Sequence, residues 1–369
     1  MEKNMFNVPS LVAKWISIGL SVAFFTFSYL PSYSQDSAII ASQKLVKAFM
    51  QKHHLPGLSI SVAKKGKLIW SEGFGYADLE QGVQVDPANT KFRIGSVSKT
   101  FTSTAIGLLY EEGKLNLEAP IQRYVPEFPK KKWDINLRQL AGHTAGIRHY
   151  RGEENWSNKY YPTVLEGLAI FREDSLLFKP GTDYSYSSYG WNLISAALES
   201  ASEMDFLPYM QKHVFGPMGM TNTVPEFMDS LIQNRTRYYV QNEQQQLLNA
   251  PTVDNSYKWA GGGFLSTTED LILFGRAFLE NNLLRAATKS LLWTPQKTTA
   301  GTSTDYGMGW RTYHFDGRDW IGHSGGSVGG TTIFVLYPPE ELIVAITVNM
   351  TGVKYEDLHF KIGAYFLSE

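Results

Sequence analysis

The stretch RIGSVSKTFTSTAIGLLYEEG, residues 93–113, decides the fold because β-type sequence ends in it and helical sequence begins. Apolar residues at 101, 105, 108 and 109 recur with helical spacing, and Gly113 supplies a stop. The start of this helix carries Ser96 and Lys99, which share one face because they lie three residues apart. The stretch therefore predicts a helix that places an amine beside a serine hydroxyl.

Outward from this helix, the sequence is helical in the middle and β-rich towards both ends. Before it, a helix is predicted from about 36 to 55, then an alternating strand at 58–63 and a returning strand at 68–77. Helical patterns dominate from 97 to 290. The last part predicts strands at 306–313, 318–323, 331–338 and 342–349, then a helix over 353–367.

This order predicts an α+β fold, in which both chain ends build one antiparallel sheet flanked by helices. Residues 35–369 form the folded domain. Its α/β part covers about 36–96 and 300–369, and an inserted, mainly helical part covers about 97–299.

Composition narrows the class of protein. A hydrophobic content of 43% with 19% charged residues is enough for a sizeable core. A formal net charge of -1 and the lack of a basic run give no indication of a nucleic-acid partner. The absence of cysteine excludes disulfides and thiolate chemistry, and the histidines lack metal-ligand spacing. We expect no metal and no cofactor, a small-molecule or peptide substrate, and an oligomeric state that the sequence leaves open.

The N-terminus has the pattern of a secretory signal peptide. Lysines precede the uncharged apolar run at 15–30, which Pro31 ends, and small residues follow at Ser32 and Ser34. The run is short for a membrane span, which needs about 18 apolar residues. We predict that residues 1–34 are a cleaved signal, so that the protein is periplasmic or secreted and keeps no stable membrane span. The alternative is a membrane anchor formed by an uncleaved segment.

Two serines compete for the role of nucleophile. Ser324 lies in Gly322-His323-Ser324-Gly325-Gly326, a G-x-S-x-G pattern, but such an elbow needs a helix after it and here another β run follows. Ser96 instead lies near a helix N-terminus, where backbone N–H groups favour a developing oxyanion. Its neighbour Lys99 can act as a base if burial removes its proton. S-x-x-K also occurs by chance, with the lysine a solvated side chain on a helix, so this motif alone leaves the role of Ser96 open. Ser324 is predicted to be a bystander.

Downstream motifs connect Ser96 with a known family. The run KPGTDYSYSSYGWNLIS (179–195) and the tetrapeptide HSGG (323–326) follow S-x-x-K in order. This set resembles the serine penicillin-recognising hydrolases of the class C β-lactamase branch, which combine S-x-x-K with Y-x-N and with K-T-G or H-x-G. ISVAKKGKLIWSEGFGYAD, AGHTAGIRHY and VDNSYKWAGGGFLSTTEDL most resemble the mitochondrial serine β-lactamase-like protein and its bacterial relatives.

The resemblance, which covers about residues 38–368, implies a role for each motif residue. It makes Ser96 the acylated nucleophile, and Lys99 either its base or a cation that keeps Tyr186 ionised. Tyr186 would be the general base and later the proton donor to the leaving group. His323 would open the third element. Gly325 would keep the strand free of a side chain where substrate lies. The backbone N–H groups of Ser96 and Gly326 would form the oxyanion hole.

Two departures from the family pattern bear on the substrate. Ser188 stands where the family has asparagine, so it can bond Lys99 but cannot offer an amide to substrate. His323 titrates near neutral pH, which makes it a poorer counter-charge for a carboxylate than lysine. We therefore predict an esterase or peptidase. The alternatives are a penicillin-binding D-Ala-D-Ala carboxypeptidase or β-lactamase, and a scaffolding protein with vestigial activity, because some relatives assemble into polymers.

Overall fold

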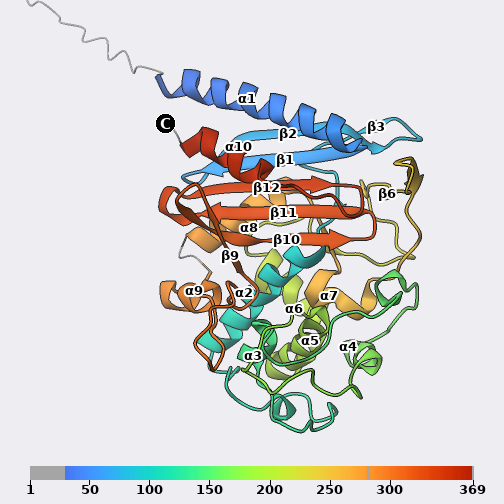
Figure 1. Cartoon of the computed structure of the whole chain (residues 1–369), viewed down its shortest axis with the longest axis vertical. Helices are drawn as coiled ribbons and strands as arrows, with labels where there is room; N and C mark the ends of the chain where they lie inside the picture. The colour runs from blue at the N-terminus through green and yellow to red at the C-terminus, as the bar shows by residue number, and fades with distance from the viewer. Residues whose placement is uncertain (1–29, 281–282, 368–369) are drawn as a thin grey trace, which may run out of the picture.

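The computed structural model describes residues 30–280 and 283–367, and a seven-stranded antiparallel sheet forms its upper half (Figure 1). The strand order is β3-β2-β1-β12-β11-β10-β9. The bounds are β1 Gly57–Lys64, β2 Lys67–Asp78, β3 Val83–Gln84, β9 Arg311–Phe315, β10 Arg318–Ser327, β11 Gly330–Tyr337 and β12 Leu342–Val348. Strand β1 pairs with β12 along its whole length, from Leu58 opposite Val348 to Lys64 opposite Leu342. The predicted sheet built from both chain ends is confirmed.

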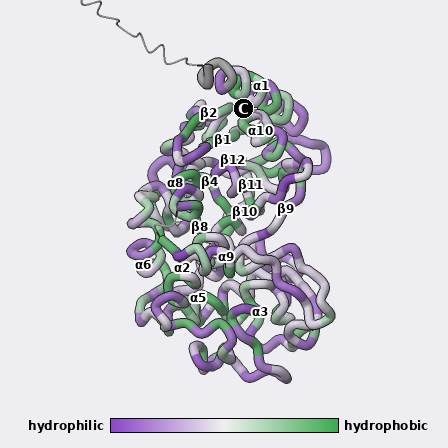
Figure 2. The backbone as a smooth tube through the Cα atoms, turned by 90° about the vertical axis from the view of Figure 1, so that its left-hand side faces the viewer, coloured by the Kyte–Doolittle hydropathy of each residue, from purple (hydrophilic) through white to green (hydrophobic). Residues whose placement is uncertain are grey.

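Helices cover both faces of the sheet. Helices α1 (Leu30–His53) and α10 (Leu358–Leu367) lie against one face, and α8 (Thr268–Leu279) lies against the other (Figures 1 and 2). Because strand residues alternate between faces, Val344 and Ile346 pack into the core below α1, while Ile343 and Ala345 join the core on the α8 side. The sheet is thus dry on both sides, which explains the unbroken apolar run of β12.

The inserted region is mainly helical and hangs below the sheet in Figure 1. Its α-helices are α2 Ser98–Glu111, α3 Leu137–Ala141, α4 Val164–Gly167, α5 Ser188–Ser202, α6 Phe206–Tyr209, α7 Trp259–Gly262 and α9 Ala286–Trp293. Short strands form two further sheets, β4 (Phe92–Arg93) with β8 (Phe264–Ser266) and β5 (Val224–Pro225), and β6 (Tyr239–Gln241) with β7 (Leu247–Asn249). The 3₁₀ turns are η1 Gly95–Val97, η2 Ile121–Arg123, η3 Glu154–Trp156, η4 Leu168–Ile170, η6 Ser256–Lys258 and η7 Pro338–Glu340, and η5 Met210–Phe215 is a π-helical turn.

Three boundaries differ from prediction. The strand predicted at 306–313 begins only at Arg311. Gly309 has φ +88, and a β-carbon there would lie 2.9 Å from the Lys99 carbonyl oxygen, so this segment leaves the sheet and packs against α2. The last helix begins at Leu358 instead of 353, and α1 begins at Leu30 instead of 36.

The residues that the structure describes include only the last few residues of the predicted signal peptide. Residues 1–29, which hold nearly all of the predicted signal segment, lie outside them. Helix α1 begins at Leu30 and so crosses the predicted cleavage point after Ser34. Within residues 30–280 and 283–367, no helix combines the length and the apolar character that crossing a bilayer requires. The same residues hold no cluster of three or more histidine, aspartate or glutamate side chains able to bind a metal ion.

Candidate active site

Two glycines allow strand β10 to run against the turn that carries Ser96. The turn is η1, which leads directly into α2. Gly95 has φ +50, and a β-carbon on it would lie 2.6 Å from the Gly326 carbonyl oxygen. A β-carbon on Gly325 would lie 1.9 Å from the Ile94 carbonyl oxygen. Side chains at either position would force the strand and the turn apart, so the glycines fix the place of Ser96 relative to β10.

Lys99 is the centre of a small hydrogen-bonded network at the start of α2. Its Nζ lies 2.9 Å from Ser96 Oγ, 3.1 Å from Ser188 Oγ and 2.7 Å from the Gly261 carbonyl oxygen. The side chain is 0% exposed. Three elements that are distant in sequence, α2, α5 and α7, therefore meet at one amine. We call Ser96, Lys99, Ser188 and Gly261 the floor.

The floor favours a neutral Lys99. Burial holds the pKa of Lys99 well below its usual range, and the charge of Lys258 lowers it further. A neutral amine has two protons to donate and one lone pair. The Gly261 carbonyl can only accept, and the Ser188 hydroxyl can accept the second proton. The lone pair then remains for the Ser96 hydroxyl, which is the geometry that a general base requires.

Tyr186 reaches the same serine from the segment before α5. Its hydroxyl shares a hydrogen bond with the Ser96 side chain, and its ring centroid lies 5.0 Å from Lys99 Nζ. Packing among other rings desolvates the phenol and raises the pKa of Tyr186 above its usual value. Of the two protonation schemes that the sequence left open, burial thus favours Lys99 as the base and Tyr186 as a neutral phenol.

Two histidines hold the segment that carries Tyr186. His143 Nδ1 accepts from the Ser187 N–H at 3.1 Å, and His149 Nδ1 accepts from the Ser188 N–H at 3.2 Å. The His143 and Tyr186 rings lie 4.2 Å apart, centroid to centroid. Ser187 caps α5 by accepting from the Gly190 N–H at 3.1 Å. These contacts turn the chain so that Tyr186 reaches Ser96 and Ser188 reaches Lys99.

His323 is placed differently from what its predicted role as third element requires. It is 2% exposed, its Nε2 lies 2.7 Å from the Tyr306 hydroxyl, and its Nδ1 lies 2.6 Å from the Ser324 carbonyl oxygen. A carbonyl only accepts, so Nδ1 carries the proton and Tyr306 donates to Nε2. Burial keeps the pKa of His323 well below its usual value. The ring is neutral, and both of its nitrogens are bonded to other groups of the protein.

The adjacent glycines have separate surroundings. Gly325 was predicted to leave space for substrate. The structure corrects this reason, because the Ile94 carbonyl fills the position that a side chain on Gly325 would take. Gly326 has open space where a β-carbon would be and lines a cavity of about 230 Å³ together with Ser96. The N–H groups of Ser96 and Gly326 stay the predicted oxyanion donors. Ser324 is absent from the lining of this cavity and borders a second one elsewhere.

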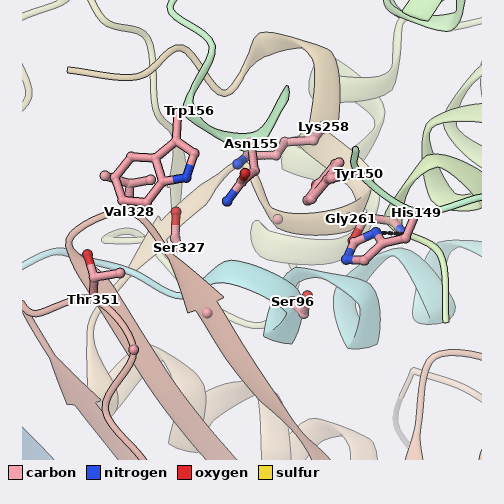
Figure 3. Close-up of a pocket in the computed structure, with 14 residues that line it drawn as sticks. Ser96, His149, Tyr150, Asn155, Trp156, Lys258, Gly261, Ser327, Val328 and Thr351 are labelled. Carbon is pink, nitrogen blue, oxygen red and sulfur yellow. Dashed lines mark hydrogen bonds between the residues drawn. The ribbon is translucent and has the colours of Figure 1, made fainter. Parts of the chain in front are cut away.

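Figure 3 shows Ser96 at one end of the cavity, below His149 and Tyr150, with the side chains of Lys258 and Asn155 at the other. The lining residues are Ser96, His149, Tyr150, Asn155, Trp156, Ser188, Lys258, Gly261, Gly262, Gly326, Ser327, Val328, Thr351 and Gly352. We call Asn155, Trp156 and Lys258 the far wall.

Sequence reasoning missed several of these residues. The glycines at 261–263 suggested close backbone packing first and a cleft-edge role second, but not that the Gly261 carbonyl accepts from Lys99. Sequence reasoning assigned nothing to Lys258, which stands in the run VDNSYKWAGGG just before three glycines. A lysine between two aromatic residues and just before three glycines was the available signal, because lysine is rarely buried without a reason.

Comparison with known proteins agrees with this geometry. The family described as "Beta-lactamase" matches residues 43–362. The human "Serine beta-lactamase-like protein LACTB, mitochondrial" is 33% identical, over 89% of this chain and 80% of that protein. "Penicillin-binding protein 4*" of Bacillus subtilis (strain 168) is 26% identical, over 88% of this chain and 75% of that protein. An octameric penicillin-binding protein homologue from Pyrococcus abyssi superimposes with a TM-score of 0.78 at 25% identity, over 90% of this chain and 78% of that one.

Proposed function

The chain belongs to the beta-lactamase family, and from that premise we propose that it is a serine hydrolase that forms an acyl-enzyme on Ser96 and cleaves an ester or amide bond. The observation that carries the proposal is the contact of 2.9 Å between Ser96 Oγ and the buried Nζ of Lys99. A serine hydroxyl is a weak nucleophile until a base takes its proton, and a desolvated amine supplies that base.

The reaction follows from the protonation states of the floor. Lys99 accepts the proton of Ser96 as Oγ attacks the carbonyl carbon, and the carbonyl oxygen becomes an oxyanion beside the N–H groups of Ser96 and Gly326. Each such donor typically contributes about 3 to 4 kcal/mol to transition-state stabilisation. Tyr186, a phenol within hydrogen-bonding reach of Ser96, supplies a proton to the leaving group. Water then attacks the acyl–serine ester and gives its proton to the Tyr186 phenolate, while Lys99 returns its proton to Ser96 Oγ. The reaction releases an acid and restores the serine hydroxyl, the neutral amine and the phenol.

Labelling with a fluorophosphonate probe tests the proposal. The wild type should be labelled at Ser96 and should hydrolyse a neutral 4-nitrophenyl ester, and Ser96→Ala should lose both properties while its thermal melt stays the same. Ser324→Ala is the matched control, because Ser324 lies outside the lining of the cavity. Equal turnover by Ser96→Ala and wild type would remove the proposal. A folded wild type that neither reacts with the probe nor hydrolyses the ester would favour the scaffolding alternative.

His323 and Ser188 lack the features with which the family pattern binds penicillin or D-Ala-D-Ala, which favours other esters and amides as substrates. The third element of penicillin-recognising enzymes offers a cation or a donor from this strand, whereas both nitrogens of His323 are bonded to Tyr306 and to Ser324. Ser188 stands in the position of the family's asparagine. Its hydroxyl cannot offer a substrate the separate donor and acceptor of an asparagine side chain. Release of D-alanine from a pentapeptide, measured beside ester hydrolysis, separates the two substrate classes.

We also propose that the chain is exported and that residues 1–34 are removed. The support is the lysine-flanked apolar run at 15–30 followed by small residues. Mass spectrometry of the exported protein should give an N-terminus at Gln35. A full-length N-terminus would instead support the membrane-anchored alternative.

A further inference from the structure

Lys258 is a buried lysine that faces the cavity and forms no ion pair with any residue that the structure describes. It lies at the end of η6, is 6% exposed and lines the same cavity as Ser96. Its Nζ lies over the faces of Tyr257 and Tyr150, 5.3 Å and 5.7 Å from the ring centroids. Within residues 30–280 and 283–367, its Nζ forms neither a hydrogen bond nor an ion pair. A buried charge in this condition is costly until it finds a counter-ion.

The two carboxylates whose charges act on Lys258 are hydrogen-bonded to other groups. Glu226 accepts from Arg93 Nε at 2.6 Å, in an ion pair that is almost fully buried. Asp254 accepts from the Ser256 N–H at 2.8 Å. Among the described residues that line the cavity, none is an aspartate or glutamate. The protein therefore supplies no anion at the place to which this amine points.

Lys258 is also the residue that brings positive charge to the cavity at neutral pH. Burial and the charge of Arg93 lower the pKa of Lys258 to about 8, while Glu226 and Asp254 counteract the fall. The amine is therefore mostly protonated at pH 7. The other titratable side chain at the rim with a pKa near neutrality in solution is His149, and burial lowers its pKa to about 4. Its ring is neutral at pH 7.

The position of the far wall sets which part of a substrate it can touch. Figure 3 shows Lys258 and Asn155 at the end of the cavity opposite Ser96, on the side where Trp156 also lies. A cation and an amide at one end of a small cavity match a carboxylate, which accepts from both. A group bound there stays away from the scissile carbonyl, so it can select substrate without entering the reaction.

We infer that the substrates of Ser96 carry a carboxylate, and that Lys258 binds this carboxylate at the end of the cavity opposite the nucleophile, with the Asn155 amide beside it. The inference rests on the proposed function, because it names the substrate class of the same site. It moves the carboxylate-binding cation from strand β10, where His323 is neutral, to the end of η6.

A pair of 4-nitrophenyl esters with acyl chains of equal length, the neutral pentanoate and the anionic glutarate monoester, tests the inference. The quantity measured is the ratio of kcat/KM for the anionic ester to that for the neutral ester at pH 7. A charged hydrogen bond of about 1.5 to 3 kcal/mol corresponds to a ratio of roughly 10 to 100 in the wild type. Lys258→Met should lower the ratio at least tenfold. Because both esters react with the same Ser96, an effect of the variant on Lys99 cancels in the ratio.

The control variant is Lys354→Met, which removes an exposed lysine that does not line this cavity and should keep the ratio of the wild type. If Lys258→Met does not fold, the inference is tested by inhibiting the wild type with small analogues of the acyl chain. Pentanoate should then inhibit hydrolysis of the neutral ester at least tenfold more strongly than pentanamide. A ratio near one in the wild type, or one that Lys258→Met leaves unchanged, overturns the inference while ester hydrolysis leaves the proposed function standing. A wild type that the fluorophosphonate probe does not label would instead contradict the proposed function.

Discussion

The floor of the cavity and its far wall each bury a lysine, but they surround it differently. Lys99 on the floor has three oxygen atoms within 3.1 Å of its Nζ. Among the residues that the structure describes, Lys258 on the far wall has instead the faces of two tyrosines, with ring centroids more than 5 Å from its Nζ. Burial lowers the pKa of both amines. On the floor, the lowered pKa leaves Lys99 as a neutral base whose two protons are donated to oxygen atoms. On the far wall, Lys258 stays a cation that has no counter-ion among the described residues.

The difference separates chemistry from selection. The floor is complete before substrate arrives, so it can activate Ser96 for any carbonyl group that reaches it. The far wall is incomplete, and only a ligand with negative charge relieves the cost of its buried cation. Substitutions on the floor should therefore change the rate for every substrate, and those on the wall should change the order of preference among substrates.

The largest effect should come from removing the base. Lys99→Met keeps the length of the side chain but takes away the acceptor for the Ser96 proton and the donor to the Gly261 carbonyl. General-base catalysis typically contributes about 100- to 10,000-fold. We expect kcat for the neutral and the anionic ester to fall by the same factor, about 1,000-fold, in steady-state assays. Because the far wall is untouched, the ratio between the esters should stay at the wild-type value.

Unequal losses for the two esters in Lys99→Met would contradict the division between floor and wall. So would retention of more than a tenth of the wild-type kcat, since Tyr186 would then be the base. A melting curve of the variant is needed beside the kinetics, because the Gly261 carbonyl loses its donor and a buried unpaired acceptor costs about 1 to 3 kcal/mol.

A smaller effect should distinguish the two adjacent glycines of β10. Gly325→Ala would push a methyl group to 1.9 Å from the Ile94 carbonyl oxygen, whereas nothing lies within 4 Å of a β-carbon on Gly326. Overpacking of this kind costs about 3 kcal/mol. We expect Gly325→Ala to lower the free energy of unfolding by about that amount in urea titrations. Gly326→Ala should keep its stability and raise KM, because its methyl group projects into the cavity.

Each glycine variant serves as the control of the other, since both add one methyl group to the same strand. Equal stability of the two variants would mean that β10 packs less closely against η1 than the contact between Gly325 and Ile94 indicates. The position of Ser96 relative to the oxyanion donors would then need another explanation.

The sequence predicted the floor better than the wall, for a physical reason. Ser96 and Lys99 are joined by helix geometry, which a spacing of three residues determines locally. The antiparallel sheet was equally accessible, because alternating strands and the turn at Asp316-Gly317 are local signals. Tyr186 and Ser188 required the family resemblance, since no local rule brings α5 to α2. The structure supplied that contact.

What the sequence could not predict is the direction of a side chain in tertiary space. His323 stands in the motif that the resemblance marks, yet its ring bonds to Tyr306, which lies in a segment predicted as a strand. Lys258 stands in no motif, yet its amine enters the cavity. Both outcomes depend on how α7 and the chain around Gly309 pack against α2, and single-sequence periodicity carries no information on that packing.

The smallest effect should appear as a shift in pH. Hydrolysis of the neutral ester needs an uncharged Lys99, so kcat/KM should rise with pH along an acid limb that reports the pKa of Lys99 in the free enzyme. The charge of Lys258 is one of the causes that lower this pKa. Removing it in Lys258→Met should move the limb to higher pH, by about half a unit for charges that interact through a partly solvated cavity. Initial rates across a pH series measure the shift.

The same pH series separates the two lysines in the wild type. Preference for the anionic ester requires Lys258 in its protonated form, so the ratio of kcat/KM should be full below the pKa of about 8 and decline as the pH rises through it. The neutral ester gains rate over the range in which Lys99 loses its proton. Two esters with one common profile would mean that a single group controls both binding and chemistry. Opposite trends would show that one amine acts on the serine and the other on the substrate's charge.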